Sequence, residues 1–157
     1  MWNQPSTWDG DTPLPVLLNN PGMAPHRSNM LKAVRHSSGY AEFESPVDGL
    51  AILWLAVADV IDRGAVNSEE VIYQWLPHSL GAFERRAEAR ILARRFSTYG
   101  IPLEMRWDPV DEDSARFLRI LDLQDLVKAM VRWLCAGWSL KNDVWTSAAA
   151  QIAKSYA

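Results

Sequence analysis

Hydrophobic residues recur at helical spacing in the segment that follows Ser45–Pro46. Serine followed by proline is typical of a helix start, because serine caps free N–H groups and proline is tolerated in the first turn. The segment ends at Gly64, a common C-terminal signal. The apolar positions between them lie three or four residues apart, and they are Leu50, Leu53, Trp54, Val57, Val60 and Ile61. This pattern predicts a central core helix.

Two more helices are predicted directly after this one. Asn67 followed by Glu70 resembles a capping box and opens a short helix, which Pro77 breaks. A longer, basic helix is then expected over residues 79–99, with Gly100 as its C-terminal signal.

The last third of the chain predicts three helices. Asp111 caps the first, and the apolar phase shifts near Asp122, which indicates a break or a kink. The next helix ends near Gly137, and its apolar face consists of Leu123, Leu126, Val127, Met130, Val131, Leu134 and Trp138. Asn142 caps the final helix, whose apolar face is Trp145, Ala148, Ala149, Ile152 and Tyr156.

The beginning of the chain lacks this regularity. Five prolines lie within residues 1–26, and proline removes a backbone donor and restricts its predecessor. The segment nevertheless carries Trp2, Trp8 and several aliphatic residues, so we expect it to fold back over the domain or to reach onto another subunit. Residues 28–38 predict a short helix ended by Gly39, and residues 40–44 are expected to be extended.

The predicted fold class is therefore all-α. We expect a compact domain of five or six helices over residues 45–157, preceded by an extended Pro/Trp-rich N-terminal arm over residues 1–44.

Composition and charge limit the partners and the cellular compartment that we expect for this protein. A net charge of −3 and a pI near 5.6 argue against a general binder of polyanions. The N-terminus lacks the pattern of a secretory signal, and the longest apolar run, Gly49–Ala58, is too short to span a bilayer. We therefore expect a cytoplasmic protein with no membrane contact. Cys135 is the single cysteine and lies in an apolar stretch, which predicts a buried thiol.

No catalytic or metal-binding motif is recognisable in the sequence. The three histidines, His26, His36 and His78, lack the spacing of a helical metal site. The acidic stretch 108–113 lacks the ligand spacing and the glycine of a calcium loop, so helix capping is its simpler role. We expect a protein that is not an enzyme and that needs no cofactor and no metal.

The basic helix over residues 79–99 carries an arginine stripe. Arg86, Arg90 and Arg94 follow one another at intervals of four, and none has an acidic residue three or four positions away. The other two arginines of this helix are Arg85, which precedes Glu88 by three residues, and Arg95. The stripe predicts either pairing with acids of neighbouring helices, namely Asp59, Asp62, Glu69 or Glu70, or the binding of phosphate or of an acidic partner.

Residues 67–99 also have the outline of a helix-turn-helix, a short capped helix followed by a turn and a longer basic helix. Three observations argue against DNA binding. The turn is longer than in the compact motif, Phe83, Ala87 and Ile91 are expected in the core, and Glu84 and Glu88 would lie near any phosphate backbone.

Eight tryptophans are many for 157 residues. Trp54, Trp138 and Trp145 fit the predicted apolar faces and are expected in the core. Four others lie off these faces and are candidate partner-binding residues, because tryptophan is enriched at interface hot spots: Trp2, Trp8, Trp107 and Trp133. The alternative is that they cover the core of their own domain from outside.

Two functional hypotheses follow. The first is a non-catalytic protein–protein interaction module, an adaptor, assembly component or inhibitor, whose Arg-rich composition suits a bacterial or phage accessory protein. It would bind a protein partner, or a second copy of itself through the arm, with the Trp-rich arm and with Arg85, Arg86, Arg90, Arg94 and Arg95. The alternative is a DNA-binding regulator that uses residues 67–99.

Overall fold

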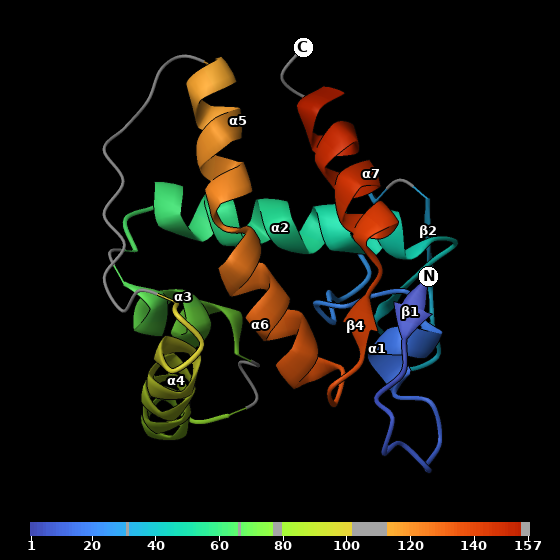
Figure 1. The fold of residues 1–157 in the computed structure, drawn as a ribbon, viewed down its shortest axis with the longest axis horizontal. Helices are drawn as coiled ribbons and strands as arrows, with labels where there is room; N and C mark the ends of the chain where they lie inside the picture. The colour runs from blue at the N-terminus through green and yellow to red at the C-terminus, as the bar shows by residue number, and fades with distance from the viewer. Residues whose placement is uncertain (31, 66, 77–79, 102–112, 155–157) are drawn as a thin grey trace.

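The computed structural model describes residues 1–30, 32–65, 67–76, 80–101 and 113–154. Helices predominate in these ranges, as expected, but the fold is not purely helical because two small antiparallel sheets accompany them (Figure 1). The helices are α1 (Leu14–Leu17), α2 (Pro46–Asp62), α3 (Ser68–Trp75), α4 (Ala82–Ser97), α5 (Asp113–Asp122), α6 (Gln124–Leu134) and α7 (Asn142–Lys154). The strands are β1 (Trp2–Asn3), β2 (Ala33–Arg35), β3 (Ala41–Phe43) and β4 (Ser139–Leu140).

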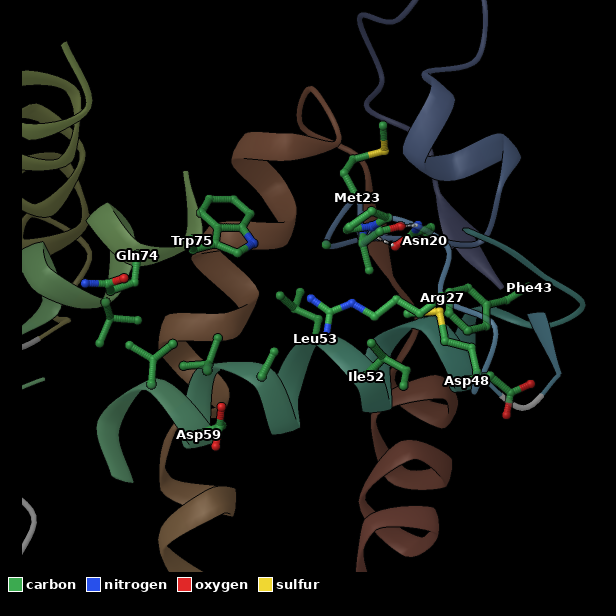
Figure 2. A pocket seen from close by; sticks show the side chains of 18 of the residues that line it. Asn20, Met23, Arg27, Phe43, Asp48, Ile52, Leu53, Asp59, Gln74 and Trp75 are labelled. Atoms are coloured by element: carbon green, nitrogen blue, oxygen red, sulfur yellow. Dashed lines mark hydrogen bonds between the residues drawn. The ribbon is translucent and has the colours of Figure 1, made fainter. Parts of the chain in front are cut away.

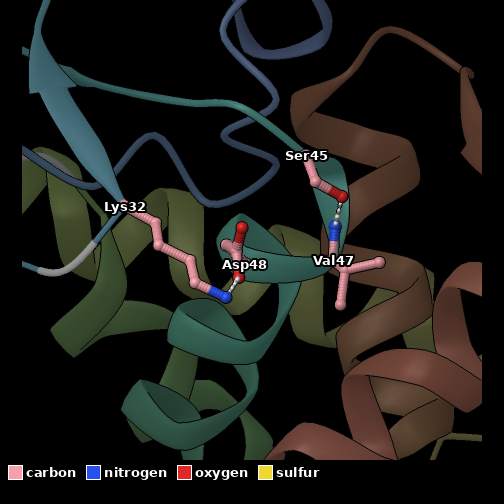
Figure 3. Close-up of polar contacts among 4 residues, drawn as sticks. All are labelled: Lys32, Ser45, Val47 and Asp48. Atoms are coloured by element: carbon pink, nitrogen blue, oxygen red, sulfur yellow. Dashed lines mark hydrogen bonds and ion pairs between the residues drawn. The ribbon is translucent and has the colours of Figure 1, made fainter.

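Helix α2 is the centre of the fold. Its predicted start is confirmed, because the Ser45 hydroxyl accepts a hydrogen bond from the Val47 N–H at 3.2 Å (Figure 3). In Figure 1, α5 and α7 run steeply across α2, and α2 also contacts α3 and α6. The Trp54 indole N–H donates to the Ile120 carbonyl of α5 at 2.6 Å, and its ring lies edge-on to Trp145 of α7 at 5.5 Å. Trp54 thereby ties three helices together.

Helices α5 and α6 meet at the predicted break. Helix α5 ends at Asp122 and α6 begins at Gln124, with Leu123 buried between them. The predicted apolar face of α6 is largely confirmed, since Leu126, Val127, Met130 and Val131 are buried. The proposed cap of α5, Asp111, lies outside the described residues.

Helix α4 packs on α3 at the edge of the molecule (Figure 1). The expectation that Phe83, Ala87 and Ile91 belong to the core is wrong, because all three are exposed. The buried side of α4 is formed instead by Arg85, Ala89, Leu92, Ala93 and Phe96. Two apolar stripes compete on this helix, and the one rich in alanine is buried because small side chains let α4 approach α3 closely.

The first 44 residues fold back onto the helices, which is one of the two placements the sequence leaves open. Strand β1 pairs with β4, with Trp2 opposite Leu140. The Trp8 ring lies edge-on to Trp138 at 6.1 Å. These contacts place the beginning of the chain against the connection between α6 and α7.

The short helix predicted over residues 28–38 is wrong. Strand β2 occupies part of this segment and pairs with β3, which confirms the extended conformation expected for residues 40–44. Tertiary packing overrides helix propensity here, because Ala41 and Phe43 are buried and hold the hairpin in place. The buried Asn20 side chain donates to the carbonyls of Ala24 and Ala41, both at 2.9 Å, and so joins the hairpin to the preceding loop.

The start of α2 lies so close to the arm that residue 49 must be glycine. A Cβ atom at Gly49 would overlap the Asn19 carbonyl oxygen and touch the Pro21 ring. We therefore expect Gly49→Ala to lower the free energy of unfolding by more than about 2 kcal/mol, because backbone must move. Gly10→Ala is the matched control, since its Cβ would meet only the Trp8 ring at 3.9 Å. Urea denaturation measures both, and equal stabilities would contradict the close approach.

Candidate functional site

Helix α4 presents an amphipathic surface to solvent. Phe83, Ala87 and Ile91 form an apolar stripe, and Phe83 and Ile91 are 87% and 54% exposed. Residues three positions further along, Arg86, Arg90 and Arg94, are also exposed and flank this stripe on one side. We call these six residues the α4 face. It is the opposite side of the helix from the stripe that packs on α3.

Arg85 does not belong to this surface, although the sequence grouped it with the other arginines. It is 8% exposed, and its Nη2 donates to the Tyr73 carbonyl at 2.7 Å while the guanidinium lies over the Tyr73 ring. The Tyr73 carbonyl would normally accept from the N–H four residues later, but residue 77 is proline and has none. Arg85 supplies the missing donor, and its predicted anion-binding role is replaced by a structural one.

The exposed arginines differ in their surroundings. Arg90 Nε lies 3.5 Å from Glu69 Oε1, which confirms for this residue the pairing expected with acids of α3. The Arg86 guanidinium lies over the Tyr73 ring at 3.9 Å. Within the described ranges, Arg86, Arg94 and Arg95 have no carboxylate partner. Arg86 and Arg94 of the α4 face therefore carry positive charge that no carboxylate of the described residues neutralises.

The candidate tryptophans cover the core of their own domain. Trp2, Trp8 and Trp133 are half-buried and pack against it. The Trp2 indole donates to the Asn19 side chain at 3.2 Å, and the Trp133 ring lies edge-on to Trp75 at 5.8 Å. Trp107 lies outside the described residues. Trp2, Trp8 and Trp133 were predicted to contact a partner. In the structure, part of their ring surface is instead in contact with other residues of the same chain.

A groove of about 1560 Å³ lies between the arm, α2, α3 and α7 (Figure 2). Ile52, Ala56 and Val60 of α2 belong to its lining and succeed one another at intervals of four. The arm contributes Met23 and Met30, and α3 contributes Tyr73, Gln74 and Trp75. The groove was not predicted from the sequence. Its signal is that α2 is apolar on a second side, beyond the face that the core needs.

The charged residues of the groove are partly paired. Asp48 lies 3.9 Å from the Lys32 ammonium (Figure 3), and Asp59 lies 2.6 Å from the Arg63 guanidinium. The Arg27 side chain extends from the arm over α2, near Leu53 (Figure 2). In the part of the chain that the structure describes, Arg27 has no carboxylate partner.

The described residues offer little catalytic chemistry. Burial raises the pKa of the Cys135 thiol from 9.0 to about 12, so the nucleophilic thiolate is disfavoured. No group of three His, Cys, Asp or Glu side chains within these ranges is placed to hold a metal ion. His78 and the acids at 108, 111 and 112 lie outside them. None of the described helices has both the length and the apolar character needed to cross a bilayer.

Comparison with known proteins adds no relative: no protein-family model matches the chain, and no curated protein matches it significantly.

We expect Arg85→Met to lower the free energy of unfolding by about 1.5–3 kcal/mol. The substitution keeps the aliphatic length but leaves the Tyr73 carbonyl without its charged donor. Arg94→Met, on the exposed side of the same helix, is the control and should change stability by less than about 0.5 kcal/mol. Urea denaturation compares the two variants, and equal effects would show that the Arg85 hydrogen bond contributes nothing.

The Cys135 thiol should resist modification in the folded protein. The folded state keeps its proton up to about pH 12, whereas the unfolded chain releases it near the ordinary value of 9.0. Between these values the folded state binds more protons, so the free energy of unfolding falls as pH rises, by up to about 1.4 kcal/mol per pH unit. In the Cys135→Ala variant, the free energy of unfolding should lack this contribution to its pH dependence. Denaturation of both proteins at several pH values between about 9 and 11 measures the difference.

Proposed function

We propose that this protein is a non-catalytic interaction module that binds an acidic, partly apolar surface of another protein through the α4 face. The observation that carries the proposal is the exposed stripe from Phe83 to Ile91 beside Arg86 and Arg94, which have no carboxylate partner in the part of the chain that the structure describes. Large exposed apolar side chains in a contiguous stripe are typical of interaction sites. Arginine is likewise enriched at the centres of interfaces.

The magnitudes favour the apolar stripe as the source of affinity. Fully burying a phenylalanine or an isoleucine contributes about 1.5–3 kcal/mol, so Phe83 and Ile91 together supply a large part of a specific interaction. Exposed ion pairs contribute less, about 0.2–1 kcal/mol each. Arg86 and Arg94 would instead select an acidic partner and speed its association. In this proposal the arm covers the core of its own domain, and α4 makes the contact with the partner protein.

DNA binding is the second candidate, because Arg86, Arg94 and Arg95 are exposed on the longer helix of the α3–α4 pair. In a complex with DNA, these arginines alone would bind the phosphate groups. An apolar stripe along the middle of the exposed side has no role in contacts to a phosphate backbone, which favours the protein partner. The two candidates therefore differ in whether Phe83 and Ile91 contribute to binding.

Fluorescence anisotropy with two labelled probes separates these candidates. One probe is an amphipathic Leu/Glu helical peptide of about 20 residues, and the other is a mixed-sequence DNA duplex, each at about 50 and 200 mM salt. We expect the peptide to bind, and the double variant Phe83→Ser/Ile91→Ser to weaken it at least tenfold. Arg86→Gln/Arg94→Gln should weaken it less and flatten its salt dependence.

Leu118→Ser is the matched control, because Leu118 is 61% exposed on α5, away from the α4 face. It should leave peptide binding unchanged, and the thermal melts of all variants should match the parent protein. Salt-sensitive binding of DNA that survives the Phe83→Ser/Ile91→Ser change would overturn the proposal in favour of a DNA-binding regulator.

A further inference from the structure

The groove along α2 has the shape of a helix-binding site. Its floor includes the stripe Ile52, Ala56 and Val60, in which Ala56 is exposed and the other two side chains are half-buried. The arm forms one wall, and α3 with Trp75 forms the other (Figure 2). An apolar stripe at positions i, i+4 and i+8 of one helix can pack against a similar stripe on a second helix.

The dimensions of the groove agree with a helix as its occupant. Its lining on α2 extends from Val47 to Val60, about 20 Å along the helix axis at 1.5 Å per residue. A helix of about four turns has about the same length, so a helix of this size can lie along the α2 side of the groove.

The charges of the groove select an acidic occupant. The Asp48 and Asp59 carboxylates are already paired with cations of this chain, and the third lining acid, Glu70, is not free either. Arg27 of the arm and Arg86 of α4 also line the groove, and their guanidiniums have no carboxylate partner among the described residues. Carboxylates on a bound helix would form ion pairs with both guanidiniums.

We infer that the groove binds an amphipathic, acidic helix of about four turns from a partner protein. Its apolar side packs on Ile52, Ala56 and Val60, and its carboxylates pair with Arg27 and Arg86. Met23 and Met30 adapt to the side chains that enter, since methionine fills irregular gaps. The inference rests on the proposed function, because it names the segment that the partner protein inserts. Arg86 belongs both to the α4 face and to the groove, so one partner can occupy the two surfaces together.

Two matched alanines separate the groove from the α4 face experimentally. Ala56 is exposed at the groove floor, and Ala87 is exposed in the middle of the α4 face. Ala56→Trp fills the groove and leaves α4 unchanged, whereas Ala87→Trp obstructs α4 and leaves the groove open. Both alanines are solvent-accessible, so neither variant should lower the melting temperature by more than a few degrees.

The probe is the labelled Leu/Glu peptide, with a Leu/Lys peptide of the same pattern for comparison. We expect the acidic peptide to bind at the groove as well as at the α4 face, and Ala56→Trp to raise the dissociation constant of the groove site at least tenfold. Arg27→Gln should raise it about threefold to tenfold and reduce its dependence on salt. The Leu/Lys peptide should bind more weakly than the Leu/Glu peptide to the unmodified protein.

The outcomes distinguish failure of this inference from failure of the proposed function. Loss of binding in Ala87→Trp with unchanged binding in Ala56→Trp would overturn the groove inference and leave the α4 proposal intact. Binding that neither tryptophan alters would overturn both. Displacement of the peptide from the groove by dodecanoate, with tighter binding of the fatty acid than of the peptide, would replace the partner helix by a lipid-like ligand and so overturn the inference as well.

Discussion

The fold depends on the need of α2 to bury its apolar surface. One side of α2 packs on α5, α6 and α7, and its N-terminal turn packs on the arm at Gly49 and Asn19. Trp54 is the point where these helices meet, because its ring packs on α7 while its N–H is satisfied by a carbonyl of α5. A single hydrophobic helix thus determines the position of its neighbours and leaves a narrow apolar strip uncovered.

The position of α4 follows from a different constraint, the missing backbone donor after α3. The Tyr73 carbonyl lacks its helical N–H partner because of Pro77, and Arg85 reaches it from the next helix. This contact fixes the rotation of α4 about its axis. With Arg85 turned toward α3, the stripe of Phe83, Ala87 and Ile91 must face solvent. The surface proposed for a partner is therefore a consequence of how one buried guanidinium satisfies one carbonyl.

Local sequence signals predicted the larger helices well. The caps Ser45 and Asn67 and the break after Asp122 act through neighbouring residues, so they can be recognised without knowledge of the fold. The rotation of α4 could not be recognised in this way, because two apolar stripes of similar strength compete and the choice is made by contact with α3. The β2–β3 hairpin depends in the same way on the burial of Phe43 and on the distant Asn20 amide. The groove could not be predicted from local signals, because one of its walls is the arm, and the sequence left the position of the arm open.

The pairing of β1 with β4 has a consequence for synthesis of the chain. Trp2 and Trp8 are made well before their neighbours Leu140 and Trp138, which follow them by 138 and 130 residues in the chain. At translation rates of about 5–20 residues per second, these two indoles wait for about 7–28 s before their native contacts exist. During that interval the nascent chain displays the aromatic surface of these residues. The prolines around these tryptophans disfavour β-pairing with other chains, and so protect the segment while its native partners are still missing.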